Sequence, residues 1–351
     1  MTSASGGGFG PPIPLARRAG KTGGGRAPAE HAAGFVVSGV LLLVFAGAVT
    51  AWLVDGIVTY EVPVGDFLKG IVVPDTTGTS AVLGPYEWAL TAALLVTGVL
   101  SVAMRSAARG AGLLLAFLLL ALTLRQGVGL LDAHYREALT EGHHGAWQLV
   151  TYGAGLGISV VVLIVLLRAR EAPYRPPGGA LRTAGVLLLL CGAVSAAWLV
   201  DGERFAQRYL GGGWGDFFHG LVDASAPHHP ASSLAPASSD FYAVALAVAL
   251  PAVGVLALAG RPAARGAGVL LLAVQAYFAL RYFTGLEWEH LGQVLDSARG
   301  LLLFLTEIVL VPMSVAGVIL LLRTPPAAGA GARGPAAAWP APPPTAPGPY
   351  G

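Results

Sequence analysis

The chain has 351 residues, of which 55% are apolar and only 11% charged, and its mean hydropathy is +0.68. Soluble globular domains carry roughly a quarter charged residues, so this composition excludes an ordinary soluble protein. A net charge of +2 provides no basic surface for nucleic acid, and the single cysteine, Cys191, cannot form a disulfide within the chain. The sequence therefore predicts an all-α, polytopic membrane protein.

Eight apolar segments, most close to the roughly 20 residues that cross a bilayer, recur along the chain. We expect transmembrane helices at 35–54, 86–104, 110–131, 147–167, 184–200, 241–259, 266–286 and 301–322. The Gly-, Ala- and Pro-rich stretches 1–34 and 324–351 predict a disordered tail at each end. The first apolar segment is too long and begins too late for a signal peptide, so we expect it to stay in the membrane.

An internal repeat is the strongest feature of the sequence. The motif AWLVDG occurs at 51–56 and 197–202, GDFLKGIV at 65–72 is followed by GDFFHGLV at 215–222, and RSAARGAG at 105–112 by RPAARGAG at 261–268. The last offset, 156 residues, also relates Arg125 to Arg281 and His134 to His290. We expect two tandem four-helix units, 35–168 and 184–323, joined by a linker at 169–183 and related by a pseudo-two-fold axis along the membrane normal.

The basic residues indicate the orientation of the chain. The tails, the linker and the two short turns that contain ARG hold 14 of the 21 Lys and Arg residues but only two acidic residues. The opposite side holds the other 7 basic and 17 acidic residues. By the positive-inside rule, we expect a multi-pass protein of the cell membrane with both termini in the cytoplasm.

The segments on the outer side are longer than hairpin turns require. They cover 55–85, 132–146, 201–240 and 287–300 and contain several Trp, Tyr and Phe residues. Aromatic residues of this kind favour the membrane surface or a small folded cap. We expect an acidic, aromatic and histidine-containing cap on the outside of the membrane.

Two arginines lie deep in the predicted helices. About 14 apolar residues precede Arg125 and Arg281, which puts both roughly 21 Å from the inner boundary. An unpaired charge there costs about 2.5 kcal/mol or more. Because Asp55 and Asp201 end the first helix of each unit at a similar height, we expect the structural ion pairs Asp55–Arg125 and Asp201–Arg281, and Glu307 could join Arg281. A proton or ion pathway is the alternative, although few polar residues continue toward the cytoplasm.

Seven of the eight histidines fall in the outer segments, next to several carboxylates. His134, His219 and His290 could therefore help to bind Zn²⁺ or Cu²⁺, or the histidines could simply be solvated. The GDF motifs add Asp66 and Asp216 as candidate ligands. We expect these two aspartates to be helix N-caps that start short amphipathic helices, with Phe67, Leu68, Phe217 and Phe218 facing the lipid.

The sequence lacks the motifs of the common soluble enzymes, such as GxSxG, HExxH or a Walker A loop. The main hypothesis is a non-catalytic membrane protein whose outer cap binds a partner protein of the cell envelope, or an ion such as a divalent metal. The alternative is a small transporter or channel with its site between the duplicated units. A membrane-embedded enzyme ranks third, because no paired acid, base or nucleophile is evident.

Overall fold

The structure is a computed structural model that describes residues 29–74, 84–141, 145–169, 178–209, 213–225, 239–286 and 291–324. Within these ranges, eight helices are long and apolar enough to cross a membrane. They are α1 (Ala32–Thr59), α3 (Pro85–Val102), α4 (Ala107–Gly129), α6 (Gly145–Arg168), α7 (Gly179–Tyr209), α9 (Ser239–Leu258), α10 (Ala263–Thr284) and α12 (Ala298–Arg323). The prediction of an all-helical, multi-pass membrane protein is confirmed at this level.

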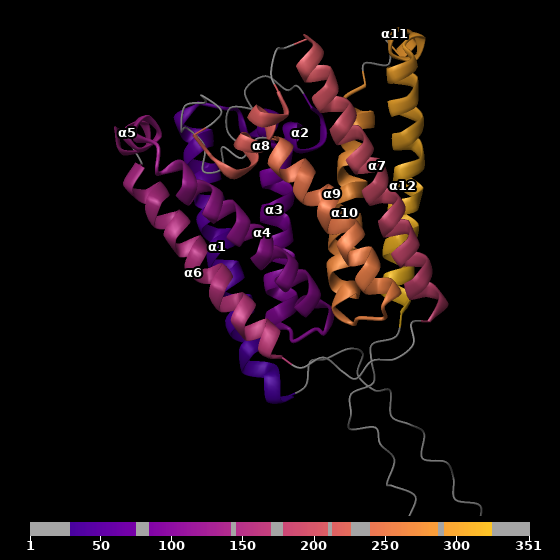
Figure 1. The fold of residues 1–351 in the computed structure, drawn as a ribbon. Coiled ribbons are helices and arrows are strands. Elements are labelled where there is room, and N and C mark those ends of the chain that lie inside the picture. The colour runs from indigo at the N-terminus through magenta and orange to yellow at the C-terminus, as the bar shows by residue number, and fades with distance from the viewer. Residues whose placement is uncertain are drawn as a thin grey trace, which may run out of the picture.

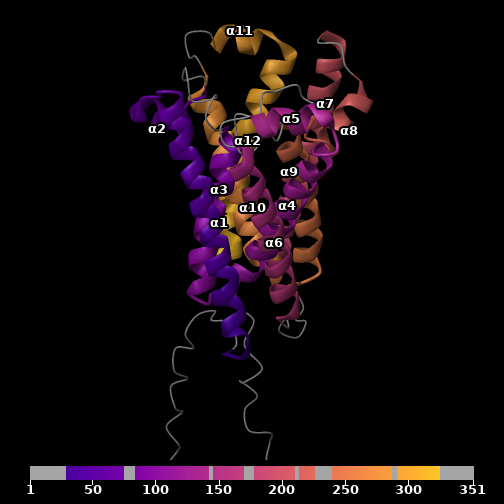
Figure 2. The same ribbon diagram turned by 90° about the vertical axis from the view of Figure 1, so that its left-hand side faces the viewer.

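Four short helices gather at one end of the bundle, which we call the cap end (Figure 1). They are α2 (Val64–Val72), α5 (Ala133–Glu141), α8 (Trp214–Val222) and α11 (Leu291–Asp296). The start of α1 and the end of α12 lie at the opposite end, as do the turns 103–106 and 259–262 (Figures 1 and 2). We call this second end the turn end.

Several helix boundaries differ from the expected ones. A 3₁₀ turn at Ala29–His31 leads into α1, so the last residues of the predicted tail are helical. At its other end α1 runs past Asp55 to Thr59, shortly before Pro63, a residue that disfavours the helical conformation in the residue before it. Helix α7 starts inside the expected linker and continues to Tyr209. Residues 1–28, 170–177 and 325–351, which include the rest of the linker and tails, lie outside the described residues.

The helices of the two predicted units form two neighbouring groups (Figure 1). In the first group α1 packs against α3 and α6, and α4 packs against α3 and α6. In the second group α7 packs against α9 and α12, and α10 packs against α9 and α12. The main contact between the groups is made by α4 and α10.

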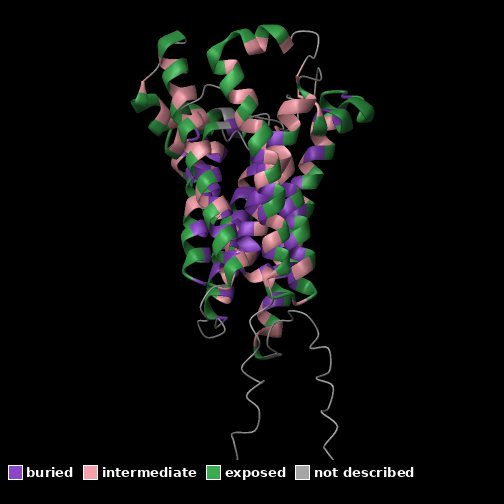
Figure 3. Cartoon of the chain, turned by 90° about the vertical axis from the view of Figure 1, so that its right-hand side faces the viewer, coloured by how far each residue is buried: buried purple, intermediate pink, exposed green. Residues whose placement is uncertain are grey.

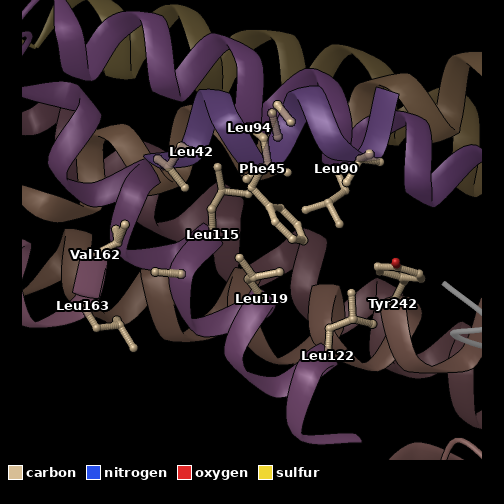
Figure 4. Close-up of a cluster of buried hydrophobic side chains, with 14 of the residues drawn as sticks. Leu42, Phe45, Leu90, Leu94, Leu115, Leu119, Leu122, Val162, Leu163 and Tyr242 are labelled. Atoms are coloured by element: carbon tan, nitrogen blue, oxygen red, sulfur yellow. The ribbon is translucent and has the colours of Figure 1, made fainter. Parts of the chain in front are cut away.

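Each group has its own apolar core, and the buried residues concentrate along the middle of the bundle (Figure 3). The first core includes Leu42, Leu94 and Leu119, all fully buried, and takes in Tyr242 from α9 of the second group (Figure 4). Tyr242 also stacks on Tyr86 of α3, with ring centroids 5.2 Å apart. The two groups therefore share apolar packing close to the cap end.

Positions that the repeat relates make matching contacts at the turn end. Helix α3 ends in a turn where Arg105 N donates to Leu100 O, and α9 ends in a turn where Arg261 N donates to Leu256 O. The left-handed residue of the second turn is Gly260, at φ 69°, and its counterpart in the first is Met104, at φ 53°. Glycine adopts this conformation without steric cost, so the first turn is the more strained of the two.

Glycines allow the closest helix crossings. A Cβ atom on Gly110 would overlap the carbonyl oxygen of Ala263, and one on Gly266 would overlap the carbonyl oxygen of Ala107. These contacts lie where α4 meets α10, and each is the counterpart of the other in the repeat. Backbones this close leave no room for a side chain.

The outward surface of the spanning helices is apolar. Val44, Val96, Val160, Val255 and Ile308 are all exposed, and they come from five different spans. Helices that are apolar on the inside and on the outside are typical of a bilayer environment, since water would not solvate their outer faces. Burial and composition therefore agree on a membrane-embedded bundle.

Candidate functional site at the cap end

Arg125, near the cap end of α4, reaches out of its own group. Its side chain is 2% exposed, and its Nε donates to the carbonyl oxygen of Gly220 in α8 at 2.9 Å. The guanidinium carbon also lies 5.8 Å from the ring centroid of Phe241 in α9. The partners of this arginine thus include residues of the second unit.

Arg281 makes the corresponding crossing in the other direction. Its Nη1 donates to the carbonyl oxygens of Gly70 and Ile71 in α2, the second at 2.8 Å. Tyr277, one turn earlier on α10, donates its hydroxyl proton to Ile71 O at 2.7 Å, and Thr284 donates to Val72 O. Helix α10 therefore holds the last turn of α2 by several hydrogen bonds.

Both arginines bind the carboxyl-terminal turn of a short helix. The last carbonyl groups of a helix lack partners within the helix and carry partial negative charge, so a guanidinium is well suited to them. Gly70 and Gly220 are themselves counterparts in the repeat. The crossing contacts reduce the cost of burying the two guanidinium groups and fasten each short helix to the opposite group.

The predicted ion pairs have different outcomes. Asp201 pairs with Arg299 of α12 at 2.8 Å, so the expected Asp201–Arg281 pair is wrong. The error has a physical reason: α7 continues beyond Asp201, and the carbonyl groups of α2 satisfy Arg281. No described contact tests Asp55–Arg125, which stays a prediction.

Glu307 does not join Arg281. It lies in α12, and its Oε2 is buried without a hydrogen-bond partner among the described residues. Tyr282 of α10 lies close enough to interact with it electrostatically. The described contacts of Arg281 therefore do not include the Glu307 carboxyl group.

The end of α7 extends beyond the apolar part of the helix. Asp201 to Tyr209 form nine residues of continuous helix, about 13 Å long, and follow the apolar stretch that ends at Val200. Arg299 fixes this extension, because its guanidinium binds Asp201 and lies 4.2 Å from the ring centroid of Phe205. Phe205 is 44% exposed and Tyr209 64% exposed, and their rings contact each other.

The helices α2 and α8 each expose an apolar stripe. Its members are Val64, Leu68 and Val72 in α2, and Trp214, Phe218 and Val222 in α8. The prediction that Phe67 faces the lipid is wrong, because its side chain is buried against Trp88, with ring centroids 4.9 Å apart. One full turn of helix separates the members of each stripe, so each stripe occupies one face.

Asp66 and Asp216 are not the N-caps of these helices. The caps are Pro63 and Gly213, and both aspartates lie in the first helical turn. Asp216 instead accepts a hydrogen bond from the backbone N–H of Gly213 at 2.9 Å. An acidic residue in the first turn stabilises a helix through the dipole, so both aspartates have a structural role in α2 and α8.

The candidate histidines do not converge where the structure describes them. His219 of α8 lies 3.2 Å from Asp223, one turn away, while His134 lies on α5, and His290 falls outside the described residues. Among the described residues, no three His, Cys, Asp or Glu side chains are arranged to hold a metal ion. The metal site from these residues therefore has no geometric support in this part of the chain.

Asp223 follows α8 directly and connects it to the next segment. Burial raises the pKa of its carboxyl group. The backbone and hydroxyl hydrogen bonds from Ser225, both at 2.8 Å, and the neighbouring His219 together lower this pKa by more, so the net pKa lies below the ordinary value. Ala224 and Ser225 pack against Gly129 of α4. This carboxylate is thus part of the attachment of α8 to α4.

A second buried polar contact supports the same region. Tyr135 of α5 donates its hydroxyl proton to Oε1 of Gln126 in α4 at 2.6 Å. Burial raises the pKa of the Tyr135 hydroxyl to about 12, so it remains a hydrogen-bond donor at neutral pH. The cap end is joined to α4 by both α5 and α8.

Two apolar grooves lie between the groups. The first has a volume of about 850 Å³ and runs between α3 and α10, and the second has a volume of about 390 Å³ and runs mainly between α4 and α9. Several positions that line the second groove, such as Phe117 and Val248, are repeat counterparts of positions that line the first. Both grooves are lined mainly by Ala, Val and Leu side chains.

Several important residues were missed by the sequence analysis. The acceptors Gly70 and Gly220 belong to the repeated GDF motifs, and their equal spacing from Asp66 and Asp216 was a usable signal. Tyr277 and Arg299 gave no such signal, because neither has a counterpart of the same type in the first unit. A comparison of the chain with protein-family models, curated proteins and solved structures finds no match.

Proposed function

We propose that the chain is a non-catalytic, multi-pass membrane protein whose cap end binds a partner protein of the cell envelope. The observation that carries this proposal is the extension of α7, which exposes Phe205 and Tyr209 beyond the apolar span. Exposed aromatic residues on a fixed framework are typical of protein interfaces. Arg299 holds the extension in place, and the stripe of α8 adds Trp214 and Phe218 at the same end.

The buried polar groups support a structural rather than a chemical role for the spans. Arg125 and Arg281 engage helix carbonyl groups, which leaves them bound within the protein rather than facing a substrate. These contacts make α2 and α8 a stable part of the bundle. A partner would then meet a preformed surface, which lowers the entropic cost of binding.

Photo-crosslinking in native membranes tests the proposal. A photoreactive phenylalanine analogue in place of Tyr209 should yield a protein adduct of one defined mass. The same analogue in place of Val44, an exposed residue of α1, should yield lipid adducts only. The variant Phe205→Ser should weaken the protein adduct at position 209, because the two rings support each other.

Lipid adducts alone at position 209 would overturn the proposal, since they would place the aromatic residues in the membrane interface.

We further propose that the protein resides in the cell membrane with the cap end outside and the termini in the cytoplasm. The distribution of basic residues supports this orientation.

We also propose that the two units are related by a pseudo-two-fold axis along the membrane normal. The reciprocal arginine crossings, the paired glycine contacts of α4 and α10, and the stacking of Tyr86 on its counterpart Tyr242 support this relation. A chain of two such units has even numbers of spans in each, which gives both units the same orientation.

The alternative function is a small transporter or channel with its site between the units. The two grooves favour it, because they lie in that position. Their lining is apolar, so a transported molecule would itself be apolar rather than an ion. Flux of an apolar dye in liposomes that persists without residues 203–238 would support the transporter and contradict the role of the cap.

A further inference from the structure

The groove between α3 and α10 has the dimensions of a lipid chain. On α3 its lining extends from Trp88 to Leu100, a rise of about 18 Å along the helix. One leaflet of a bilayer has a hydrocarbon depth of about 15 Å. Ala92 and Ala273 widen the groove, and both are exposed on the surface of the bundle. A lipid could therefore enter from the side.

The groove ends in positive charge at the turn end. Arg105 and Ser106, in the turn after α3, and Arg265, in the first turn of α10, line this end. Arg265 is held in position because its Nε and Nη2 donate to the carbonyl oxygens of Leu321 and Leu322 at 2.9 and 3.0 Å. Arg105 is exposed where it lines the mouth of the groove.

We propose that this groove binds an anionic phospholipid from the leaflet next to the turn end. One acyl chain lies along Ala92, Val96 and Ala273, and the phosphate lies between Arg105 and Arg265, with the hydroxyl of Ser106 as a further donor. Two guanidinium groups suit a phosphodiester, which accepts several hydrogen bonds and carries a full negative charge. Basic pockets between spanning helices are a common type of lipid headgroup site.

The second groove, between α4 and α9, differs from the first in ways that leave only one lipid site expected. Val248 and Phe117 stand where the first groove has Ala92 and Ala273, and their larger side chains narrow the second groove. Its described lining on α4 begins at Leu114 and contains no arginine. The counterpart of Arg265, Arg109, makes the same kind of contact, because its Nε donates to Leu166 O at 2.9 Å, but it is not among the residues that line the second groove. The two grooves thus differ in width and in charge.

Native mass spectrometry of the purified full chain can measure the binding. We expect phosphatidylglycerol to bind more tightly than phosphatidylcholine with the same chains, by at least about fivefold, the effect of one basic residue near an anionic lipid. Arg105→Gln should reduce this preference, and Arg105→Gln/Arg265→Gln should abolish it. The control Arg261→Gln/Arg323→Gln removes the same charge from exposed positions at the turn end and should leave the preference unchanged.

A second variant tests the groove apart from the charge. Ala273→Phe copies the residue of the narrower groove and should reduce the binding of both lipids, whereas Phe117→Ala should not create a second anionic site. If Arg105→Gln/Arg265→Gln and the control Arg261→Gln/Arg323→Gln reduced the preference for phosphatidylglycerol equally, the preference would reflect general electrostatic attraction to the turn end. That result would overturn the proposal. Displacement of the lipid by glycerol 3-phosphate alone would also overturn it, because a site for a free anion needs no groove.

Discussion

Arginines inside a membrane need acceptors, and here the acceptors include the carbonyl groups of short helices. Arg125 binds Gly220 O, and Arg281 binds Gly70 O and Ile71 O. A helix end offers partial negative charge to a guanidinium group without adding a second desolvated ion. The roles of both arginines are therefore structural in this fold.

Replacing Arg125 by Met should lower the free energy of unfolding by about 2 kcal/mol, which is typical for a lost hydrogen bond to a charged group. Methionine keeps the length and apolar packing of the stem but leaves Gly220 O without this donor. Thermal unfolding in detergent measures the effect. As a control, Arg299→Met breaks an exposed ion pair and should cost less, about 1 kcal/mol or below. Equal effects would mean that the crossing adds no more stability than an exposed ion pair does.

Asp223 should make stability depend on acid pH. Its pKa is lowered in the folded protein, so its contribution is fully present above the ordinary aspartate pKa, about 4, and is lost as the pH falls through the lowered value. Asp223→Asn should therefore destabilise the protein near pH 7 and have a smaller effect near pH 3. Thermal unfolding of parent and variant at both pH values decides this, and a pH-independent difference would contradict it.

At the scale of helices, the contact of α4 with α10 depends on glycine. Gly110→Ala should destabilise the bundle by about 1 to 3 kcal/mol, because the new methyl group would overlap the Ala263 carbonyl and push the helices apart. Gly127→Ala, on the same helix with open space around it, should instead stabilise by up to about 1 kcal/mol through helix propensity. Thermal unfolding of the two variants should therefore shift in opposite directions.

The elements were largely predictable, because apolar length alone defines a membrane span and the repeat located the short helices α2 and α8. The positions where the helices end were less predictable. The sequence after Asp201 continues α7 with good helix formers, but a charged residue that follows an apolar run also marks a span end. Burial of Phe67 rather than Leu68 was not predictable either, since both are apolar and their order does not reveal which face meets Trp88.

The partners of the two arginines could not be predicted from the repeat. The repeat predicts that Arg125 and Arg281 have equivalent surroundings. It does not tell whether the partners of each arginine lie in the same unit or in the other one, because both arrangements would give equivalent surroundings. Asp201 was assigned to Arg281 because the two residues lie at a similar height in the predicted spans, and Arg299 has no counterpart arginine in the first unit that would have pointed to it. Such choices depend on the packing of α4 against α10, which no local pattern encodes.

For the molecule as a whole, the eight spans predict that both ends of the chain lie on one side of the membrane. The basic turns, the start of α1 and the end of α12 all lie at the turn end, so we expect reporters fused to either terminus to be cytoplasmic. A tag inserted at 232–238, outside the described residues, should be accessible from outside the cell. Protection of this tag in intact cells would overturn the orientation.

The crossing of the arginines also sets an order for biogenesis. Arg125 enters the membrane before Gly220 exists, because 95 residues separate them. At roughly 5 to 20 residues per second, a ribosome needs about 5 to 20 s to supply that acceptor. The wait for Gly70 is longer, since its donor Arg281 follows 211 residues later. Until the second group of helices arrives, Arg125 therefore lacks its Gly220 acceptor and the end of α2 lacks its Arg281 donor, which makes the cap end the last part of this protein to mature.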